Sequence, residues 1–128
     1  MKFLLDTHTV LWSLLEEDRL SPTAVAALDD STNELHLSMA SLWEATIKIA
    51  SGKMRVPGQS VDYLLQKIEE TGVKLVPILP LHLQQLQVLP RLHGDPFDRI
   101  ILCQSIVEQM PIISADTALR RYQTSILW

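Results

Sequence analysis

The sequence predicts an α/β fold, with a mostly parallel central sheet of about four or five strands and helices on both faces. Short, continuously apolar runs, typical of strands buried on both faces, alternate along the chain with longer segments of helical spacing. Strands that alternate with helices are joined by right-handed crossovers and lie parallel to one another. The 128 residues are 47% hydrophobic and 20% charged, which is typical of a packed core, so we expect a single domain over residues 1–128.

The first third of the chain is expected to form two strands and two helices. Residues 3–5 are an apolar run that stops at Asp6, which places Asp6 at the carboxyl end of a strand. A helix is expected over residues 9–15. A second helix follows Ser21-Pro22, because serine is a good N-cap and proline is favoured at the first helical position. Residues 35–38 are expected to be the second strand.

The middle third is expected to contain three helices and one strand. Ser41-Leu42-Trp43-Glu44 has the Ser-x-x-Glu form of a capping box, so a helix is expected to begin there and to end near Gly52. Ser60 is expected to cap the next helix, which closes at Gly72. Residues 73–78 resemble a strand, and Pro77 places it near an edge or an end. The helix over residues 80–89 is expected to face the core with Leu81, Leu83, Leu86 and Leu89.

The last third begins with Asp95-Pro96-Phe97-Asp98, which places two carboxylates at the start of an expected helix. Asp95 precedes Pro96 and is therefore the expected N-cap. Asp98 falls in the first turn, at the rim of a helix that is otherwise apolar enough to be buried. Residues 111–116 repeat the first pattern, an apolar run that ends in Asp. A short helix over residues 117–122 and a strand over 125–128 are expected to complete the fold.

Charge and composition limit the classes of partner. The net charge is −4, so the overall field does not attract nucleic acid, and a polyanion would have to be held by a local basic patch or by metal ions. The single cysteine, Cys103, excludes a disulfide framework. The apolar N-terminus is too short for a signal peptide, and no run approaches the roughly 20 residues that span a bilayer. We therefore expect a cytoplasmic protein without membrane contact.

Four acids occupy equivalent places in the expected topology. Asp6 and Asp116 end strands, whereas Glu44 and Asp98 begin helices, and both kinds of position lie at the carboxyl edge of a parallel sheet. Carboxylates that lie close together repel unless a cation joins them, and oxygen-only ligands favour Mg²⁺ or Mn²⁺ over zinc. Such a centre is suited to phosphodiester hydrolysis. Three of these acids have an ordinary alternative: Glu44 alone could be a capping-box residue, Asp98 a first-turn acid and Asp116 the cap of the helix that begins at Thr117.

The chain resembles the PIN domain and, within it, the VapC-type toxins of bacterial toxin–antitoxin pairs. The motifs that carry the resemblance are Leu4-Leu5-Asp6-Thr7-His8, Ser41-Leu42-Trp43-Glu44, His93-Gly94-Asp95-Pro96-Phe97-Asp98-Arg99 and Ile113-Ser114-Ala115-Asp116. The His-x-Asp-Pro-Phe-Asp-Arg string is the most specific of these and indicates one VapC-like subgroup. The resemblance implies a PIN-like three-layer fold.

The resemblance also implies an activity and its residues. Asp6, Glu44, Asp98 and Asp116 would be the catalytic acids of a Mg²⁺- or Mn²⁺-dependent endoribonuclease, with Asp6, Asp98 and Asp116 as metal ligands. The implied partners are RNA, a small VapB-like antitoxin and a second copy of the chain. A non-cleaving PIN domain that binds RNA or protein is the alternative. A haloacid dehalogenase-type phosphatase is disfavoured, because it needs an Asp where this chain has His8.

Further residues are expected to support this site. Thr7, Asp95, Ser114 and Arg99 are the candidates, with Ser114 holding a neighbouring carboxylate or a water and Arg99 pairing with a carboxylate. Candidates for contact with RNA are Lys48, Lys53, Arg55, His8 and His93. The two histidines could equally be partly buried residues that bond to backbone. Trp12 and Trp43 could stack on bases, although core or dimer-interface positions are the commoner use of such residues.

Overall fold

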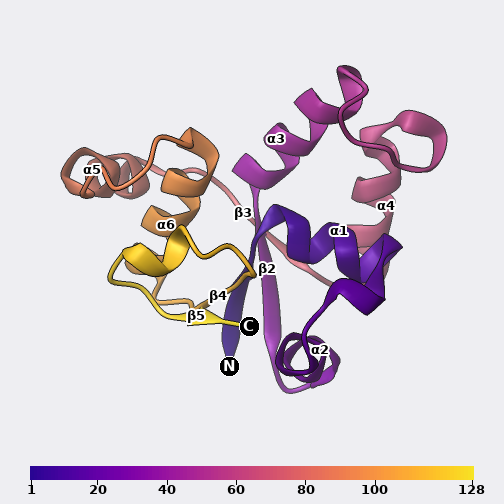
Figure 1. Cartoon of the computed structure of the whole chain (residues 1–128), viewed down its shortest axis with the longest axis horizontal. Coiled ribbons are helices and arrows are strands. Elements are labelled where there is room, and N and C mark those ends of the chain that lie inside the picture. The colour runs from indigo at the N-terminus through magenta and orange to yellow at the C-terminus, as the bar shows by residue number, and fades with distance from the viewer.

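Five parallel strands form one sheet in the order β3-β2-β1-β4-β5 in the computed structural model, which describes all 128 residues (Figure 1). The strands are β1 (Lys2–Leu5), β2 (Glu34–Ser38), β3 (Lys74–Val76), β4 (Ile112–Ile113) and β5 (Ile126–Leu127). The central strand β1 pairs with β2 and β4, so that Leu5 lies between Leu37 and Ile113. The predicted α/β fold with a parallel sheet is confirmed.

Six helices cover the two faces of this sheet. They are α1 (Thr7–Leu15), α2 (Pro22–Asp29), α3 (Met39–Ala50), α4 (Val61–Thr71), α5 (Pro80–Val88) and α6 (Pro96–Glu108), with 3₁₀ turns η1 (Glu17–Arg19), η2 (Pro57–Gln59) and η3 (Leu119–Arg121). In Figure 1, α1, α2 and α4 lie on one side of the sheet and α5 and α6 on the other. None of these helices combines the length and the apolar character needed to cross a bilayer.

Two apolar cores lie on opposite faces of the sheet, because successive residues of a strand point to opposite sides. Phe3 and Leu5 of β1 belong to the core beneath α1, α2, α3 and α4. Leu4 and Ile112 belong to the core beneath α6. Each strand that is buried on both faces must therefore be apolar throughout, which explains the unbroken runs in the sequence.

The structure corrects the start of α3. This helix begins at Met39, and its N-cap is Ser38, whose Oγ accepts the backbone N–H of Ala40 at 3.0 Å. Ser38 ends β2 directly before the helix, so it meets the free N–H groups first. Ser41 lies within the helix, where its Oγ is buried without a partner, and the predicted capping box with Glu44 is wrong.

Two other helix boundaries differ from the sequence prediction. Asp6 caps α1, so that helix starts at Thr7 rather than at residue 9. In place of the helix expected over residues 117–122, the chain forms only the single turn η3.

The buried face of α5 is also different from the one predicted. Leu86 and Leu89 pack in the core as predicted. Leu81 and Leu83, however, are 60% and 54% exposed, and His82 is completely buried instead. His82 turns inward because its ring is fully bonded: Nδ1 accepts the N–H of Leu79 at 2.9 Å, and Nε2 lies 2.9 Å from Glu108 Oε1 on α6. Because these hydrogen bonds hold His82 toward the core, its chain neighbours Leu81 and Leu83 point toward the surface.

Candidate active site

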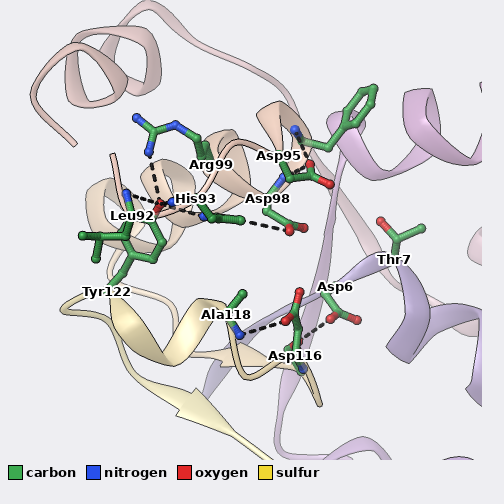
Figure 2. A network of polar contacts seen from close by, with 12 residues as sticks. Asp6, Thr7, Leu92, His93, Asp95, Asp98, Arg99, Asp116, Ala118 and Tyr122 are labelled. Atoms are coloured by element: carbon green, nitrogen blue, oxygen red, sulfur yellow. Dashed lines mark hydrogen bonds and ion pairs between the residues drawn. The ribbon is translucent and has the colours of Figure 1, made fainter. Parts of the chain in front are cut away.

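The strand order brings the carboxyl ends of β1, β2 and β4 together at one edge of the sheet. Asp6 follows β1, α3 with Glu44 follows β2, and Ser114 and Asp116 follow β4. The N-terminus of α6 adds Asp98 to the same edge. In Figure 2 the carboxylates of Asp6, Asp98 and Asp116 point into one shared space. The structure thus gathers acids from four separate segments of the chain.

Asp6 is the most firmly held of these acids and is only 7% exposed. Its Oδ1 accepts the N–H of Thr9 at 2.7 Å as the cap of α1, and its Oδ2 accepts the hydroxyl of Ser114. Ser114 Oγ in turn accepts the N–H of Asp116 at 3.0 Å. The Ser114 hydroxyl therefore links the acid after β1 to the loop that carries the acid after β4.

Glu44 is buried and is held from two sides. The hydroxyl of Thr7 donates to its Oε1 and the ammonium group of Lys48 donates to its Oε2, each at 3.0 Å. Lys48 lies one turn later on α3, whereas Thr7 begins α1, so Glu44 joins the two helices. The position of Thr7 next to Asp6 in the chain brings Glu44 close to the acid at the end of β1.

Asp95 and Asp98 have different roles at the start of α6. Asp95 is the N-cap that the sequence predicts, because its Oδ1 accepts the backbone N–H groups of Phe97 and Asp98 at 2.9 and 3.0 Å. The Asp98 side chain makes no capping bond; its Oδ2 lies 3.2 Å from Nε2 of His93. Asp95 thus fixes the first turn of the helix, and that turn directs Asp98 toward the shared space.

The surroundings of Asp98 disfavour its charge. Burial, followed by the negative charges of Asp95, Asp116 and Glu44, raises the pKa of this carboxyl to about 6, against the lowering effect of the His93 hydrogen bond. A cation in the shared space would reverse this effect by stabilising the ionised form.

The donor set fits Mg²⁺ or Mn²⁺, because it consists of carboxylate oxygens without thiol ligands. Asp116 is exposed and uses one oxygen to accept the N–H of Ala118 at 2.9 Å. With the side chains as they stand, no three His, Cys, Asp or Glu residues lie close enough together to coordinate one ion. Mg²⁺ in proteins usually keeps several of its waters, so some of these acids would hold an ion through water rather than directly.

Arg99 does not pair with a carboxylate, contrary to the sequence expectation. Its guanidinium donates to the carbonyls of Pro90 and Leu89 at 2.9 and 3.3 Å and to the hydroxyl of Tyr122 at 3.1 Å. Successive residues of a helix are rotated by about 100°, so the side chain of Arg99 points away from Asp98 and the other acids and contacts the loop before α6. Tyr122 was not identifiable from the sequence, because no local spacing links it to His93, 29 residues earlier.

Most of the candidate RNA-binding residues line one surface pocket, which we call the basic pocket. It has a volume of about 380 Å³ and lies between α1, η1, the end of α3 and the segment that follows α3. Its lining includes the predicted residues His8, Lys48, Lys53 and Arg55, together with Trp12, Glu16 and Arg19. His93 lies outside this pocket.

The side chains around the basic pocket pack against one another. His8 is exposed and its ring lies 5.8 Å from that of Trp12, so the alternative of a buried histidine is wrong for His8. The guanidinium of Arg19, a residue that sequence reasoning missed, lies 4.5 Å from the centre of the Trp12 ring. Trp43 lies outside the pocket, is 60% exposed and contacts Phe97 edge to face, with ring centres 5.1 Å apart.

A parallel α/β sheet with acids gathered at its carboxyl edge is the arrangement of a PIN domain, and the family model for the PIN domain matches residues 3–124. The chain belongs to this family. No curated protein sequence gives a significant match.

Solved structures with the same fold come from bacterial protein pairs. VapBC2 of Rickettsia felis, bound to a DNA fragment from its promoter, matches with a TM-score of 0.76 and 14% identity over 98% of this chain and 96% of that one. VapBC-1 of nontypeable Haemophilus influenzae matches with a TM-score of 0.66 and 13% identity. FitAcB of Neisseria gonorrhoeae matches with a TM-score of 0.65 and 18% identity, and both matches cover 98% of this chain and 96% of the other. These likenesses extend over nearly the whole of each chain.

Proposed function

We propose that this protein is a metal-dependent endoribonuclease that hydrolyses RNA phosphodiester bonds and is the toxin of a type II, VapBC-like toxin–antitoxin pair. The observation that carries the proposal is the convergence of Asp6, Glu44, Asp98 and Asp116 from four segments at one edge of the sheet. The negative charges of Glu44 and Asp116 disfavour the ionised form of Asp98, so the position of Asp98 among these acids costs stability in the metal-free protein. A cation-binding catalytic site gives a reason for their arrangement.

Each acid has a distinct task in this proposal. Asp6, Asp98 and Asp116 would hold Mg²⁺ or Mn²⁺, which when bound supplies activation of water and stabilisation of the oxygens in an in-line displacement at phosphorus. Glu44, whose carboxylate is fixed by Thr7 and Lys48, would bind or orient the attacking water or complete the metal shell. The hydroxyl of Ser114 would keep Asp6 in place during turnover.

The basic pocket would hold the RNA next to these acids. Lys48 lines the pocket and also donates to Glu44, so the pocket and the acidic edge are adjacent. Lys53 and Arg55 are exposed there and would contact phosphates, while Trp12 offers a ring on which a base can stack. Local positive charge at this place offsets the net negative charge of the chain.

The proposal includes two protein partners in the cytoplasm, a VapB-like antitoxin and a second copy of the chain. The segment from β3 through α5 exposes large apolar side chains at Leu75, Ile78, Leu79, Leu81, Leu83 and Val88. Apolar surface of this kind commonly marks a protein interface. We assign it to a homodimer, so light scattering of the purified protein should give about twice the 14.5 kDa of one chain, and a mass of 14.5 kDa would contradict the assignment.

The activity is tested by incubating single-stranded and structured RNA with the protein and Mg²⁺ or Mn²⁺. The wild type is expected to cleave internally, and Asp6→Asn should lose cleavage by at least about 100-fold, since the amide cannot replace the charge of a ligand. Asp18→Asn, at an exposed acid of η1, is the matched control and should retain full activity. Equal activity of wild type and Asp6→Asn would reject the role of Asp6.

Calorimetry with Mn²⁺ separates this function from the alternative of a non-cleaving binding module. A catalytic site should bind Mn²⁺ in the wild type and lose most of that binding in Asp6→Asn. RNA binding without Mn²⁺ binding and without cleavage would favour the binding module.

A further inference from the structure

Tyr122 lies at the centre of a hydrogen-bond network that ends on Asp98 (Figure 2). The side chain is buried directly after η3, and its ring packs against that of His93 with centres 5.3 Å apart. Its phenol oxygen has four partners: the backbone N–H of Leu92 at 3.3 Å, the backbone N–H of His93 at 3.2 Å, Nη1 of Arg99 at 3.1 Å and Nδ1 of His93 at 2.7 Å.

The protons in this network can be assigned by counting donors. Backbone N–H groups and a guanidinium can only donate, so three of the four partners of the Tyr122 oxygen are donors. The single proton of the phenol must then go to the remaining partner, Nδ1 of His93, which has to be the unprotonated ring nitrogen. This contact is also the shortest of the four, at 2.7 Å, as expected for an O–H donor.

The tautomer of His93 follows from this assignment. A neutral imidazole that accepts at Nδ1 carries its proton on Nε2, and Nε2 faces Oδ2 of Asp98 at 3.2 Å. The ring must therefore donate to Asp98. Oδ2 of Asp98 is therefore hydrogen-bonded to His93, whereas Oδ1 of Asp98 has no hydrogen bond to the protein.

We propose that Tyr122 and His93 are positioning residues for Asp98: the Tyr122 hydroxyl fixes the Nε2–H tautomer of His93, and this ring holds Asp98 with one oxygen turned toward the other acids. The inference rests on the proposed function in one respect, that Asp98 serves there as a metal ligand. Hydrogen bonds that orient ligands commonly change metal affinity by 10- to 100-fold.

Arg99 completes the arrangement from the other side. It ties Tyr122 to α6 and to the carbonyls of Leu89 and Pro90, so the loop that carries His93 is attached to the helix that carries Asp98. This explains why an arginine next to a cluster of acids contacts none of them.

Tyr122→Phe removes only the hydroxyl and is the test variant. Tyr63→Phe on α4 is the matched control, because the Tyr63 hydroxyl makes no hydrogen bond to the protein. Nitrogen NMR of the metal-free wild type at pH 8, with His93 assigned through His93→Gln, should show the proton on Nε2 and none on Nδ1. Tyr122→Phe should give a mixture of tautomers, and Tyr63→Phe should leave the wild-type signal unchanged.

Mn²⁺ calorimetry then measures the consequence. Tyr122→Phe should bind Mn²⁺ about 10-fold more weakly than the wild type, whereas Tyr63→Phe should bind equally well. His93→Gln offers an amide N–H to Asp98 and should retain more affinity than His93→Phe, which offers no donor. A loss of thermal stability without these changes would identify a purely structural role and overturn the proposal.

Different results would contradict the positioning roles of Tyr122 and His93 and the proposed nuclease function. A wild-type His93 with its proton on Nδ1, or a Tyr122→Phe variant with the wild-type tautomer and affinity, would overturn the inference even if the protein cleaves RNA. A wild type that binds no Mn²⁺ would overturn the function and with it the role of Asp98 as a ligand. The NMR result would still decide the tautomer.

Discussion

Asp95 and Asp98, three residues apart at the start of α6, should respond differently to the same substitution. Asp98→Asn is expected to abolish RNA cleavage, because it removes a charge from the shared space of the acids. Asp95→Asn should keep most of the activity and destabilise the protein by about 1 kcal/mol or less, since asparagine is also a good N-cap. Cleavage rates and urea unfolding of both variants test this, and the reverse order of effects would exchange the two roles.

The raised pKa of Asp98 predicts a dependence of stability on pH in the metal-free protein. Its folded value of about 6 exceeds the ordinary 3.8, so the folded state binds the proton more tightly. The favourable contribution is complete below about pH 4 and is lost as the pH rises through 6. At pH 7 the charged group should cost about 1 kcal/mol, after allowance for solvent screening of a partly exposed side chain.

Urea unfolding of the wild type and Asp98→Asn in EDTA measures this effect as a difference. The variant should be the more stable of the two at pH 7, by about 1 kcal/mol, and the difference should shrink toward zero at pH 4. Asp18→Asn should show no such trend. A constant difference across this range would contradict the assigned cause.

Some residues of the site can be predicted from the sequence and others cannot. Asp6 and Asp116 could be placed at the sheet edge because each closely follows an apolar strand, and that is a local signal. Tyr122 and Arg19 could not, since their significance depends on contacts with residues distant in the chain or on the surface of another helix. Arg99 was found but given the wrong partner, because sequence proximity to acids does not determine side-chain direction.

At the scale of elements, the start of α3 gives a matched pair of variants. Ser38→Ala should destabilise the protein by about 1 kcal/mol, because it removes the N-cap bond to Ala40. Ser41→Ala should be neutral or slightly stabilising, since its buried Oγ makes no hydrogen bond. Urea unfolding of the two variants decides between the observed cap and the capping box expected from the sequence. Equal destabilisation would argue that Ser41 also contributes to the helix start.

Helices were easier to locate than to orient. The spacing of apolar residues correctly predicted a helix over residues 80–89, but α5 buries His82 rather than Leu81 and Leu83. Leucine-rich helices can bury more than one face, and the choice was made by the hydrogen bonds of His82 to Leu79 and Glu108. Such a polar anchor between α5 and α6 has no signature in the sequence of either helix alone.

At the scale of the whole molecule, the sequence predicted parallel strands but not their order. That order decides the site: β1 lies between β2 and β4, so the segments that follow these three strands meet at one edge. Had β1 been at an outer position, Asp6 could not lie close to the segments after both β2 and β4. The acids themselves were therefore predictable, whereas their proximity depends on the assembled sheet.

The charge distribution of the whole molecule predicts how RNA binding responds to salt. The chain carries a net charge of −4, yet Arg19, Lys48, Lys53 and Arg55 line one pocket with a single acid, Glu16. The salt dependence of RNA binding should therefore arise from this pocket and not from the general field of the molecule. Removing one side chain that neutralises a phosphate should reduce the slope of log affinity against log salt by about 0.7 for a single strand.

The double variant Lys53→Gln and Arg55→Gln should weaken the binding of single-stranded RNA and lower that slope by about 1.4, because two phosphate-binding charges are removed. Fluorescence anisotropy in an Asp98→Asn background measures binding without cleavage. The control is Lys2→Gln with Lys74→Gln, which removes the same charge at the start of β1 and β3, on the opposite edge of the sheet. If both pairs weakened binding equally, net charge rather than the basic pocket would govern the interaction with RNA.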